Sequence, residues 1–244
     1  MGQGMDSSAV GLGMAATPEE LLEAQLVRCL VCQAGLVMAG RKPAAVFGFR
    51  PRTTDATDTA GAAARTADAT RAAVAAPREP STPHPRRLVA RLLSVYAGQT
   101  RPLGLRISCL GWRGERVMLL VWRPELVEVL LAEREVRRFL ARRGLPGDPA
   151  SLVSRLAGLL RSYYAGRRPF PHEVGIVLGY PVEDVEGFLA DGGRNAAACG
   201  RWKVYGDVRA ARRRFEELDR ADSHVKRLFS AGVPMRELLR MGAA

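Results

Sequence analysis

Residues 103–122 read LGLRISCLGWRGERVMLLVW, and this stretch decides the fold class. Two runs rich in aliphatic and β-branched residues, 103–110 and 116–122, flank the five residues 111–115, two of which are glycine. A five-residue connection that contains glycine is typical of a β-hairpin. We therefore expect two antiparallel strands here.

Helix signals dominate the rest of the chain. Thr17, Pro18 and Glu20 supply an N-cap, a first-turn proline and a capping-box acid, which predict a helix that runs to about residue 33. Further helices are expected at 86–97, 124–144, 149–164, 171–178, 181–190, 208–218, 224–230 and 235–241, and short strands at 44–49 and 202–205. The expected fold class is α+β, mainly helical with a small, at least partly antiparallel sheet.

The chain has room for one substantial domain, with 244 residues and 47% hydrophobic composition. Residues 1–16 are small and polar without periodicity and predict a disordered N-terminal tail. Residues 51–85 consist almost wholly of Ala, Thr, Asp, Arg and Pro, so they predict a flexible insertion that buries little apolar surface. Residues 17–244 are therefore expected to form a single α+β domain that this insertion interrupts.

Composition also indicates where the protein works. The longest apolar runs, near 30–40 and 117–122, are shorter than the roughly 20 residues that cross a bilayer. The first residues lack the basic and apolar regions of a secretory signal. Four scattered cysteines are too few for a disulfide framework. We expect a cytoplasmic protein with no membrane partner.

The net charge of +12 suggests an anionic partner, but its composition is unusual. Only three of the 37 basic residues are lysine, at Lys42, Lys203 and Lys226. Such an arginine bias is typical of a GC-rich coding sequence, so part of the charge is compositional. Nucleic-acid binding therefore remains an alternative and not the first choice.

Three familiar motifs are incomplete in this chain. Cys29 and Cys32 lie inside a predicted helix and pack best as two small residues on one face, and neither zinc nor another metal is expected. The glycine-rich run before Lys42 has Pro43 where a phosphate loop needs Ser or Thr. His172 and Glu173 lack the second histidine of a metalloprotease helix.

Two segments have the outline of a helix-turn-helix. The first, 173–189, carries Glu183, Asp184 and Glu186 on the helix that would enter DNA, and these would repel phosphate. The second, formed by the two closing helices, carries Lys226, Arg227, Arg236 and Arg240. It is the main support for a nucleic-acid-binding or regulatory module.

The most specific strings are FPHEVGIVLGYPVEDVEGF at 170–188 and GRWKVYGD at 200–207. Together with the lysine and proline at 42–43 and VWRP at 121–124, they resemble the domain of unknown function 3793, a bacterial family met mainly in clostridia and related anaerobes. The resemblance implies a shared fold but no activity. The family often has a Cys-Pro-Thr stretch where this chain reads AGLV at 34–37.

The lysines indicate a candidate site. Two of the three lysines lie in conspicuous contexts, next to Pro43 and Trp202, in a chain that otherwise uses arginine. Lysine is a compact cation with an adjustable pKa, suited to a phosphate, a carboxylate or a proton transfer. Both lysines fall near ends of predicted elements, where side chains from separate segments converge.

We therefore hypothesise an anion-binding cleft built from cationic, proton-transferring and aromatic side chains. In this hypothesis the cations hold a phosphate or carboxylate, His172 or Glu173 transfers a proton, and the aromatic residues form a wall. The ligand-binding candidates are Lys42, Arg123, Tyr180, Trp202, Lys203 and Tyr205, and the catalytic candidates are His172 and Glu173.

The same residues also suit a purely structural role. Tyr180, Trp202, Phe170 and Phe188 are large enough to be core residues, and acidic residues near 183 complement a helix N-terminus. Three functions stay open: a small-molecule-binding protein or enzyme, a nucleic-acid-binding or regulatory module, and a protein-protein interaction protein. The sequence indicates no particular cofactor, reaction or oligomeric state.

Overall fold

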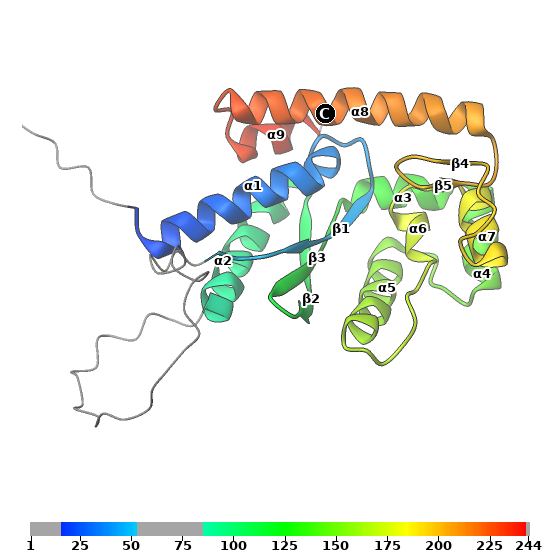
Figure 1. Cartoon of the computed structure of the whole chain (residues 1–244), viewed down its shortest axis with the longest axis horizontal. Coiled ribbons are helices and arrows are strands. Elements are labelled where there is room, and N and C mark those ends of the chain that lie inside the picture. Colours follow the sequence, from blue (N-terminus) through cyan, green and yellow to red (C-terminus); the bar gives the residue numbers. More distant parts are fainter. Residues whose placement is uncertain (1–15, 53–84, 243–244) are drawn as a thin grey trace, which may run out of the picture.

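The computed structural model describes residues 16–52 and 85–242, and its elements are drawn in Figure 1. The main sheet contains β1 (Ala44–Phe49), β2 (Arg106–Arg113) and β3 (Arg116–Trp122), in the order β1-β3-β2. Both pairings are antiparallel, which confirms the predicted hairpin and the α+β class.

Two predicted segments lie almost wholly outside the described residues. They are the N-terminal tail at 1–16 and the insertion at 51–85. The single interrupted domain therefore stays a prediction.

The central strand β3 separates two hydrophobic cores. Val117, Leu119 and Val121 point into the first core, and Leu120 points into the second. Successive side chains of a strand point to opposite faces, so a strand that is covered on both faces is apolar throughout. This explains the uninterrupted apolar run of β3 that the hairpin prediction rested on.

Four helices pack into the first core. They are α1 (Pro18–Met38), α2 (Pro85–Thr100), α8 (Val208–Ser230) and α9 (Met235–Met241). Figure 1 shows α8 as a long helix along one side of the molecule, with α1 and α9 packed beneath it.

The helix α1 begins as predicted and ends later than predicted. The Thr17 hydroxyl accepts a bond from the Glu20 N–H at 3.2 Å, and the Glu20 carboxylate accepts one from the Thr17 N–H at 2.7 Å. The helix continues past residue 33 because Ala34, Val37 and Met38 are fully buried in the fold. Such tertiary packing outweighs the weak local preferences of the last turn.

By length and composition, α1 is apolar enough to cross a membrane, with a mean hydropathy of 1.5. Core helices share this property. In the structure, half of the apolar window of α1 is buried, and Leu26 and Leu30 are fully inaccessible. The cytoplasmic location stays a prediction.

The second core is covered by helices from the middle of the chain. They are α3 (Pro124–Ala132), α4 (Arg134–Arg142), α5 (Pro149–Tyr164) and α6 (Val174–Val177). The predicted helix at 149–164 is confirmed in full.

The single helix predicted at 124–144 is two helices, α3 and α4, with Glu133 extended between them at ψ 128°. Leu131 and Val136 are both buried in the second core but stand five residues apart. In one continuous helix, five steps would turn Val136 by about 140° away from Leu131. The break lets both side chains face the core.

The hairpin also differs from its prediction. Strand β2 continues to Arg113 instead of ending at residue 110, because a bulge at Leu110 shifts the pairing from Cys109 with Leu119 to Gly111 with Met118. The turn is correspondingly tight and uses Gly114 at φ 60°, a conformation that glycine adopts without strain.

The C-terminal third contains α7 (Val182–Asp191), the short pair β4 (Ala198–Cys199) and β5 (Lys203–Val204), and the long helix α8. The strand predicted at 202–205 is β5, shortened to two residues, and its partner β4 was not predicted. The helices predicted at 208–218 and 224–230 are one helix. Its buried side chains Ala211, Leu218 and Val225 recur every seven residues, which keeps one stripe against the fold.

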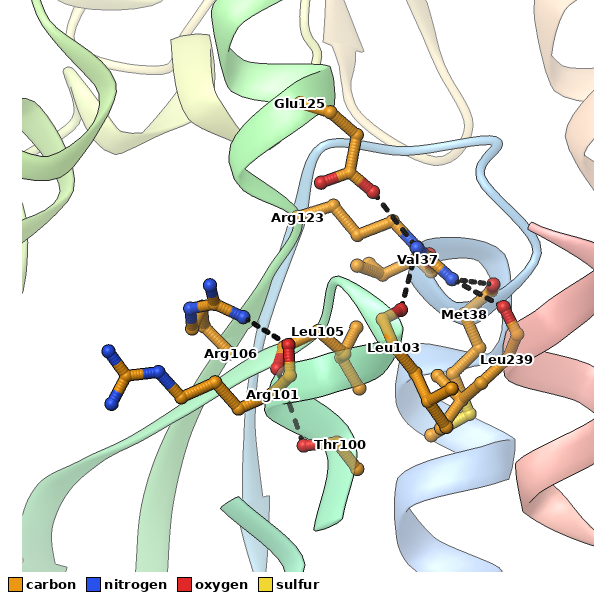
Figure 2. Close-up of polar contacts among 10 residues, drawn as sticks. All are labelled: Val37, Met38, Thr100, Arg101, Leu103, Leu105, Arg106, Arg123, Glu125 and Leu239. Carbon is orange, nitrogen blue, oxygen red and sulfur yellow. Dashed lines mark hydrogen bonds and ion pairs between the residues drawn. The ribbon is translucent and has the colours of Figure 1, made fainter. Parts of the chain in front are cut away.

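Arg123, between β3 and α3, is fully buried with 0% exposure (Figure 2). Its Nε donates to the Val37 carbonyl at 2.7 Å. Its Nη2 donates to the carbonyls of Met38 at 2.6 Å and Leu239 at 2.8 Å. These carbonyls belong to the last turns of α1 and α9, where regular α-helical bonds end and the carbonyls carry partial negative charge. The Val37 and Leu239 carbonyls also accept bonds from the N–H groups of Gly40 and Gly242.

The remaining guanidinium nitrogen completes the network. Nη1 donates to the Leu103 carbonyl of the short helix η1 (Arg101–Leu103) at 3.3 Å and to Glu125 Oε1 at 2.9 Å. All five N–H donors of the guanidinium thus have acceptors within the protein. Arg123 joins α1, α9, η1 and α3 at one point.

Replacing Arg123 by methionine should destabilise the protein by about 3 kcal/mol or more, because several buried carbonyls lose their donors at once. Urea unfolding monitored by circular dichroism measures this. Arg138→Met is the matched control, since Arg138 is exposed on α4 and should change stability by about 0.5 kcal/mol or less. Equal stability of the two variants would contradict the structural role of Arg123.

Candidate functional site

Lys42 lies in the short connection between α1 and β1, and its side chain is half-buried. The backbone N–H of Lys42 donates to the Leu36 carbonyl at 3.2 Å, which holds the connection against the end of α1. The ammonium lies 5.4 Å from the centre of the Tyr180 ring. Within residues 16–52 and 85–242, no hydrogen bond or ion pair reaches this ammonium.

The electrostatic surroundings of Lys42 disfavour its charge. Burial has the largest effect on its pKa, and together with the guanidinium groups of Arg201 and Arg214 it lowers that pKa from 10.5 to about 8. Both arginines have carboxylate partners: Arg201 lies 2.6 Å from Asp219, and Arg214 lies 3.0 Å from Glu217. Lys42 is the member of this basic cluster that the protein leaves uncompensated.

Lys42 lines a hollow of about 520 Å³, which we call the lysine hollow. Its lining includes Arg41 and Arg214 as well as carboxylate-bearing residues and the aromatic pair Tyr180 and Trp202. The acidic lining residues are Glu133, Glu135, Glu183, Asp184 and Asp207. A ligand here would meet both cationic groups and acceptor oxygens.

The aromatic wall predicted from the sequence exists in part. The rings of Tyr180 and Trp202 stack with centroids 5.0 Å apart and planes inclined by 26°. The pair sits at the boundary of two hollows and lines both. Trp202 is buried in a small core beside α8.

Asp184, which is 3% exposed, positions this wall. Its Oδ2 accepts a bond from Trp202 Nε1 at 2.6 Å. Its Oδ1 accepts bonds from the backbone N–H groups of Tyr205 at 2.7 Å and Gly206 at 2.9 Å. The carboxylate thereby ties the first turn of α7 to the segment that follows β5.

This contact explains why the two specific strings of the sequence occur together. Asp184 belongs to the string at 170–188, and its three donors belong to the string at 200–207. Gly187 adds a steric reason, because a Cβ at this position would lie 2.4 Å from the Cβ of Tyr205. The strings therefore form one packed unit beside the lysine hollow.

A second hollow of about 330 Å³, the aromatic hollow, adjoins this unit. It is lined by Phe170, His172, Phe188 and Lys203, together with the shared Tyr180, Trp202 and Asp184. The His172 ring lies between two aromatic rings, 5.1 Å from Phe170 and 4.6 Å from Phe188. Lys203 is exposed, and its ammonium donates to the Gly193 carbonyl.

Three of the predicted site residues line neither hollow. Arg123 is occupied by the structural network described above. Glu173 lies 3.6 Å from Arg143 and lines a different hollow together with it. Tyr205 packs edge-on against Phe188 at 6.4 Å, and its buried hydroxyl has no partner among the described residues.

The structure thus brings Lys42, Tyr180 and Trp202 together and places His172 and Lys203 in the adjoining hollow. Sequence reasoning missed Arg41, Arg201 and Arg214 as neighbours of Lys42. Among so many arginines, no local signal distinguishes these three. Asp184 was noted only for its charge, although its position four residues after Tyr180 places both at one end of α7.

The cysteines of the described chain are all free thiols, and Cys29 and Cys32 are half-buried on α1. Burial and the neighbouring Cys32 raise the pKa of the Cys29 thiol to about 11, so it stays protonated at neutral pH. Within the part of the chain that the structure describes, no group of three or more His, Cys, Asp or Glu side chains is arranged to hold a metal.

The fold defines an α+β protein in which a three-stranded antiparallel sheet lies between two helical layers. A hollow lined by Lys42 and by both cationic and acidic side chains opens beside its first strand. The chain belongs to the family described as protein of unknown function (DUF3793), whose model matches residues 30–239. The matched region includes Lys42, Asp184 and both specific strings. No curated protein and no solved structure matches the chain.

The pKa of Lys42 is directly measurable because the chain has only three lysines. After ¹³C-methylation, the Lys42 signal should titrate with a pKa of about 8, and Lys42→Arg identifies that signal by its loss. Since folding disfavours the charged form, the wild type should gain stability relative to Lys42→Met as pH rises through about 8. A Lys42 midpoint near 10.5 would contradict the described environment.

Asp184→Asn should destabilise the protein by about 2 kcal/mol, because the amide replaces one acceptor oxygen of a buried three-donor site with a donor. Trp202 fluorescence should change in the folded state as its indole N–H loses its acceptor. Asp219→Asn is the control, since this carboxylate is exposed and its surface ion pair contributes at most about 1 kcal/mol. A similar small effect for both variants would show that Asp184 does not organise the wall.

Proposed function

We propose that the protein binds an anionic small molecule in the lysine hollow. The observation that carries this proposal is the half-buried ammonium of Lys42, which has no acidic partner among the described residues and two guanidinium groups nearby. A phosphate or carboxylate group in the hollow would supply the missing negative charge.

The physical argument concerns the cost of the unpaired charge. Burying an ammonium and placing like charges near it both disfavour the protonated form. A bound anion reverses both effects, since it adds attraction and replaces lost hydration with hydrogen bonds. Lys42 would therefore bind an anion more strongly than an exposed lysine does, and its pKa would rise on binding.

The rest of the lining supports a ligand with more than one kind of group. Arg41 and Arg214 extend the cationic side of the hollow, while Glu133, Glu135 and Glu183 offer acceptors. A ligand that carries hydrogen-bond donors as well as an anionic group would use both. The stacked Tyr180 and Trp202 rings offer an apolar wall to a planar part of the ligand.

His172 is the candidate for proton transfer if the bound molecule is transformed. It is the histidine of the adjoining aromatic hollow, and its imidazole has no carboxylate partner among residues 85–242. Glu173 is engaged with Arg143 and is a weaker candidate. The shared Tyr180 and Trp202 place the two hollows side by side, so a molecule anchored at Lys42 would lie next to the imidazole's hollow.

Lys42→Met should abolish anion binding while the fold persists. The probes are inorganic phosphate, a phosphomonoester and a dicarboxylate, each measured by the rise in melting temperature and, in the wild type, by the upward shift of the Lys42 titration. Lys226→Met is the matched control, because Lys226 is exposed on α8 and pairs with Asp222 at 2.8 Å. The proposal fails if no probe moves the Lys42 signal, or if the two variants lose binding equally.

A further inference from the structure

Two long segments of the described chain carry arginines without any acidic residue. Residues 85–114 contain six arginines, and residues 149–172 contain four. None of the 25 acidic residues of the chain falls in either segment. Arginine bias in the coding sequence explains many arginines, but it does not by itself explain the absence of acidic residues from these two segments. Residues 24–52 also lack acidic residues and carry four arginines, so composition alone does not single out one surface.

The fold brings the two segments together. The helix α5 packs along β2, and Arg161 Nε donates to the Cys109 carbonyl of that strand at 3.3 Å. The apolar side of α5, with Leu152, Leu156 and Leu160, is buried in the second core. Arg155 and Arg161 lie on the exposed part of α5, and Arg167 and Arg168 follow shortly after the helix ends.

The four arginines of residues 149–172 are exposed and have no acidic partner among the described residues. Arg155, Arg161, Arg167 and Arg168 are all exposed, and none of them lies within ion-pair distance of a carboxylate in residues 16–52 or 85–242. On α8, by contrast, basic residues alternate with acidic ones, as in the pairs of Arg214 with Glu217 and Lys226 with Asp222. The exposed side of α5 thus has a net positive potential. On α8 the acidic residues partly cancel the potential of the basic residues.

Aromatic rings lie among these arginines. Tyr163, Tyr164 and Phe170 are half-buried, so each presents part of its ring to the surface. Trp112 is also half-buried, but it packs against the first core and Arg86 lies over its ring at 4.9 Å. The centroid of the Tyr163 ring lies 5.1 Å from the centroids of the Tyr164 and Phe170 rings. The guanidinium carbon of Arg113 lies over the Tyr163 ring, 6.0 Å from its centroid.

Two hollows flank the end of α5. One, of about 400 Å³, is lined by Trp112 and Tyr164 together with Arg161 and Arg167. The other, of about 310 Å³, is lined by a second set of guanidinium groups and by Glu173, which pairs with Arg143. Those lining arginines are Arg143, Arg155 and Arg168.

We infer that the exposed side of α5 and the adjoining part of β2, which we call the α5 surface, bind single-stranded nucleic acid. Arg155, Arg167 and Arg168 contact the phosphates, and a base stacks on Tyr164 in the hollow that this ring lines. Proteins that bind single strands without sequence preference combine a positively charged path with aromatic stacking platforms. The sequence alone pointed to the C-terminal helices for this role.

The aromatic rings favour a single strand over other polyanions. Bases in a duplex are stacked on each other and their faces are unavailable, while the bases of a single strand can stack on Tyr164. An acidic peptide would use the arginines but has no flat group for the rings. The inference is independent of the lysine hollow, since the two sites share no residue.

The test uses the full chain and a labelled oligothymidylate or oligouridylate of about 16 nucleotides, with binding followed by fluorescence anisotropy between about 50 and 200 mM salt. The variant R155Q/R167Q/R168Q should bind at least tenfold more weakly, and its salt slope should fall by about 2, since each phosphate contact on a single strand contributes about 0.7. Tyr164→Ala should weaken binding by about fivefold or more.

The matched control is R209Q/R212Q/R213Q, which removes the same charge from exposed positions on α8 and should retain binding. Loss restricted to the α5 variants, with unchanged melting temperatures, supports the inference. Equal loss in the α5 and α8 variants would overturn it, because the effect would then follow net charge alone. The inference is also overturned if the wild type binds neither oligonucleotide. A third contrary result is that polyglutamate of equal charge competes as well as the oligonucleotide while Tyr164→Ala leaves binding unchanged.

Discussion

The hydrogen-bond network of Arg123 is the interaction on which the rest of the structure depends. One buried guanidinium satisfies the terminal carbonyls of α1 and α9, and the Arg123 backbone N–H also donates to the Pro43 carbonyl at 2.9 Å. Pro43 directly follows Lys42. The residue that joins the helix ends therefore also fixes the backbone that carries the candidate ligand-binding lysine, although Arg123 itself does not face the lysine hollow.

Three ionisable groups away from solvent behave in different ways, and the difference singles out Lys42 as the candidate ligand-binding residue. Arg123 is fully compensated by carbonyls and a carboxylate, and Asp184 is fully compensated by three N–H donors. Lys42 has no such partner among the described residues, and its pKa falls to about 8. A protein that compensates its other buried charges so completely leaves Lys42 as the position where a ligand would contribute most.

Part of the site was predictable because two of only three lysines stand in distinctive strings. This reasoning selected Lys42, Tyr180, Trp202 and Lys203, whose contexts are unusual in sequence and which line the two adjoining hollows. It placed Arg123 in the same cleft because the local sequence around an arginine at the end of a strand does not show whether the side chain contacts a ligand or the ends of helices. It also missed Arg214, which lies on α8, and Arg201, which lies between β4 and β5 and pairs with Asp219 of α8. Both are near Lys42 because α8 packs against α1.

The sequence by itself determined the local elements: the capping box that starts α1, the apolar run of β3, the antiparallel hairpin and the helix α5. These follow from periodicity, caps and turn residues that act over a few positions. Only the tertiary structure decided the break at Glu133, the continuity of α8, the partner of β5 and the roles of Arg123 and Asp184. Each of these depends on which buried group finds a partner from a distant segment, and local periodicity carries no information about that partner.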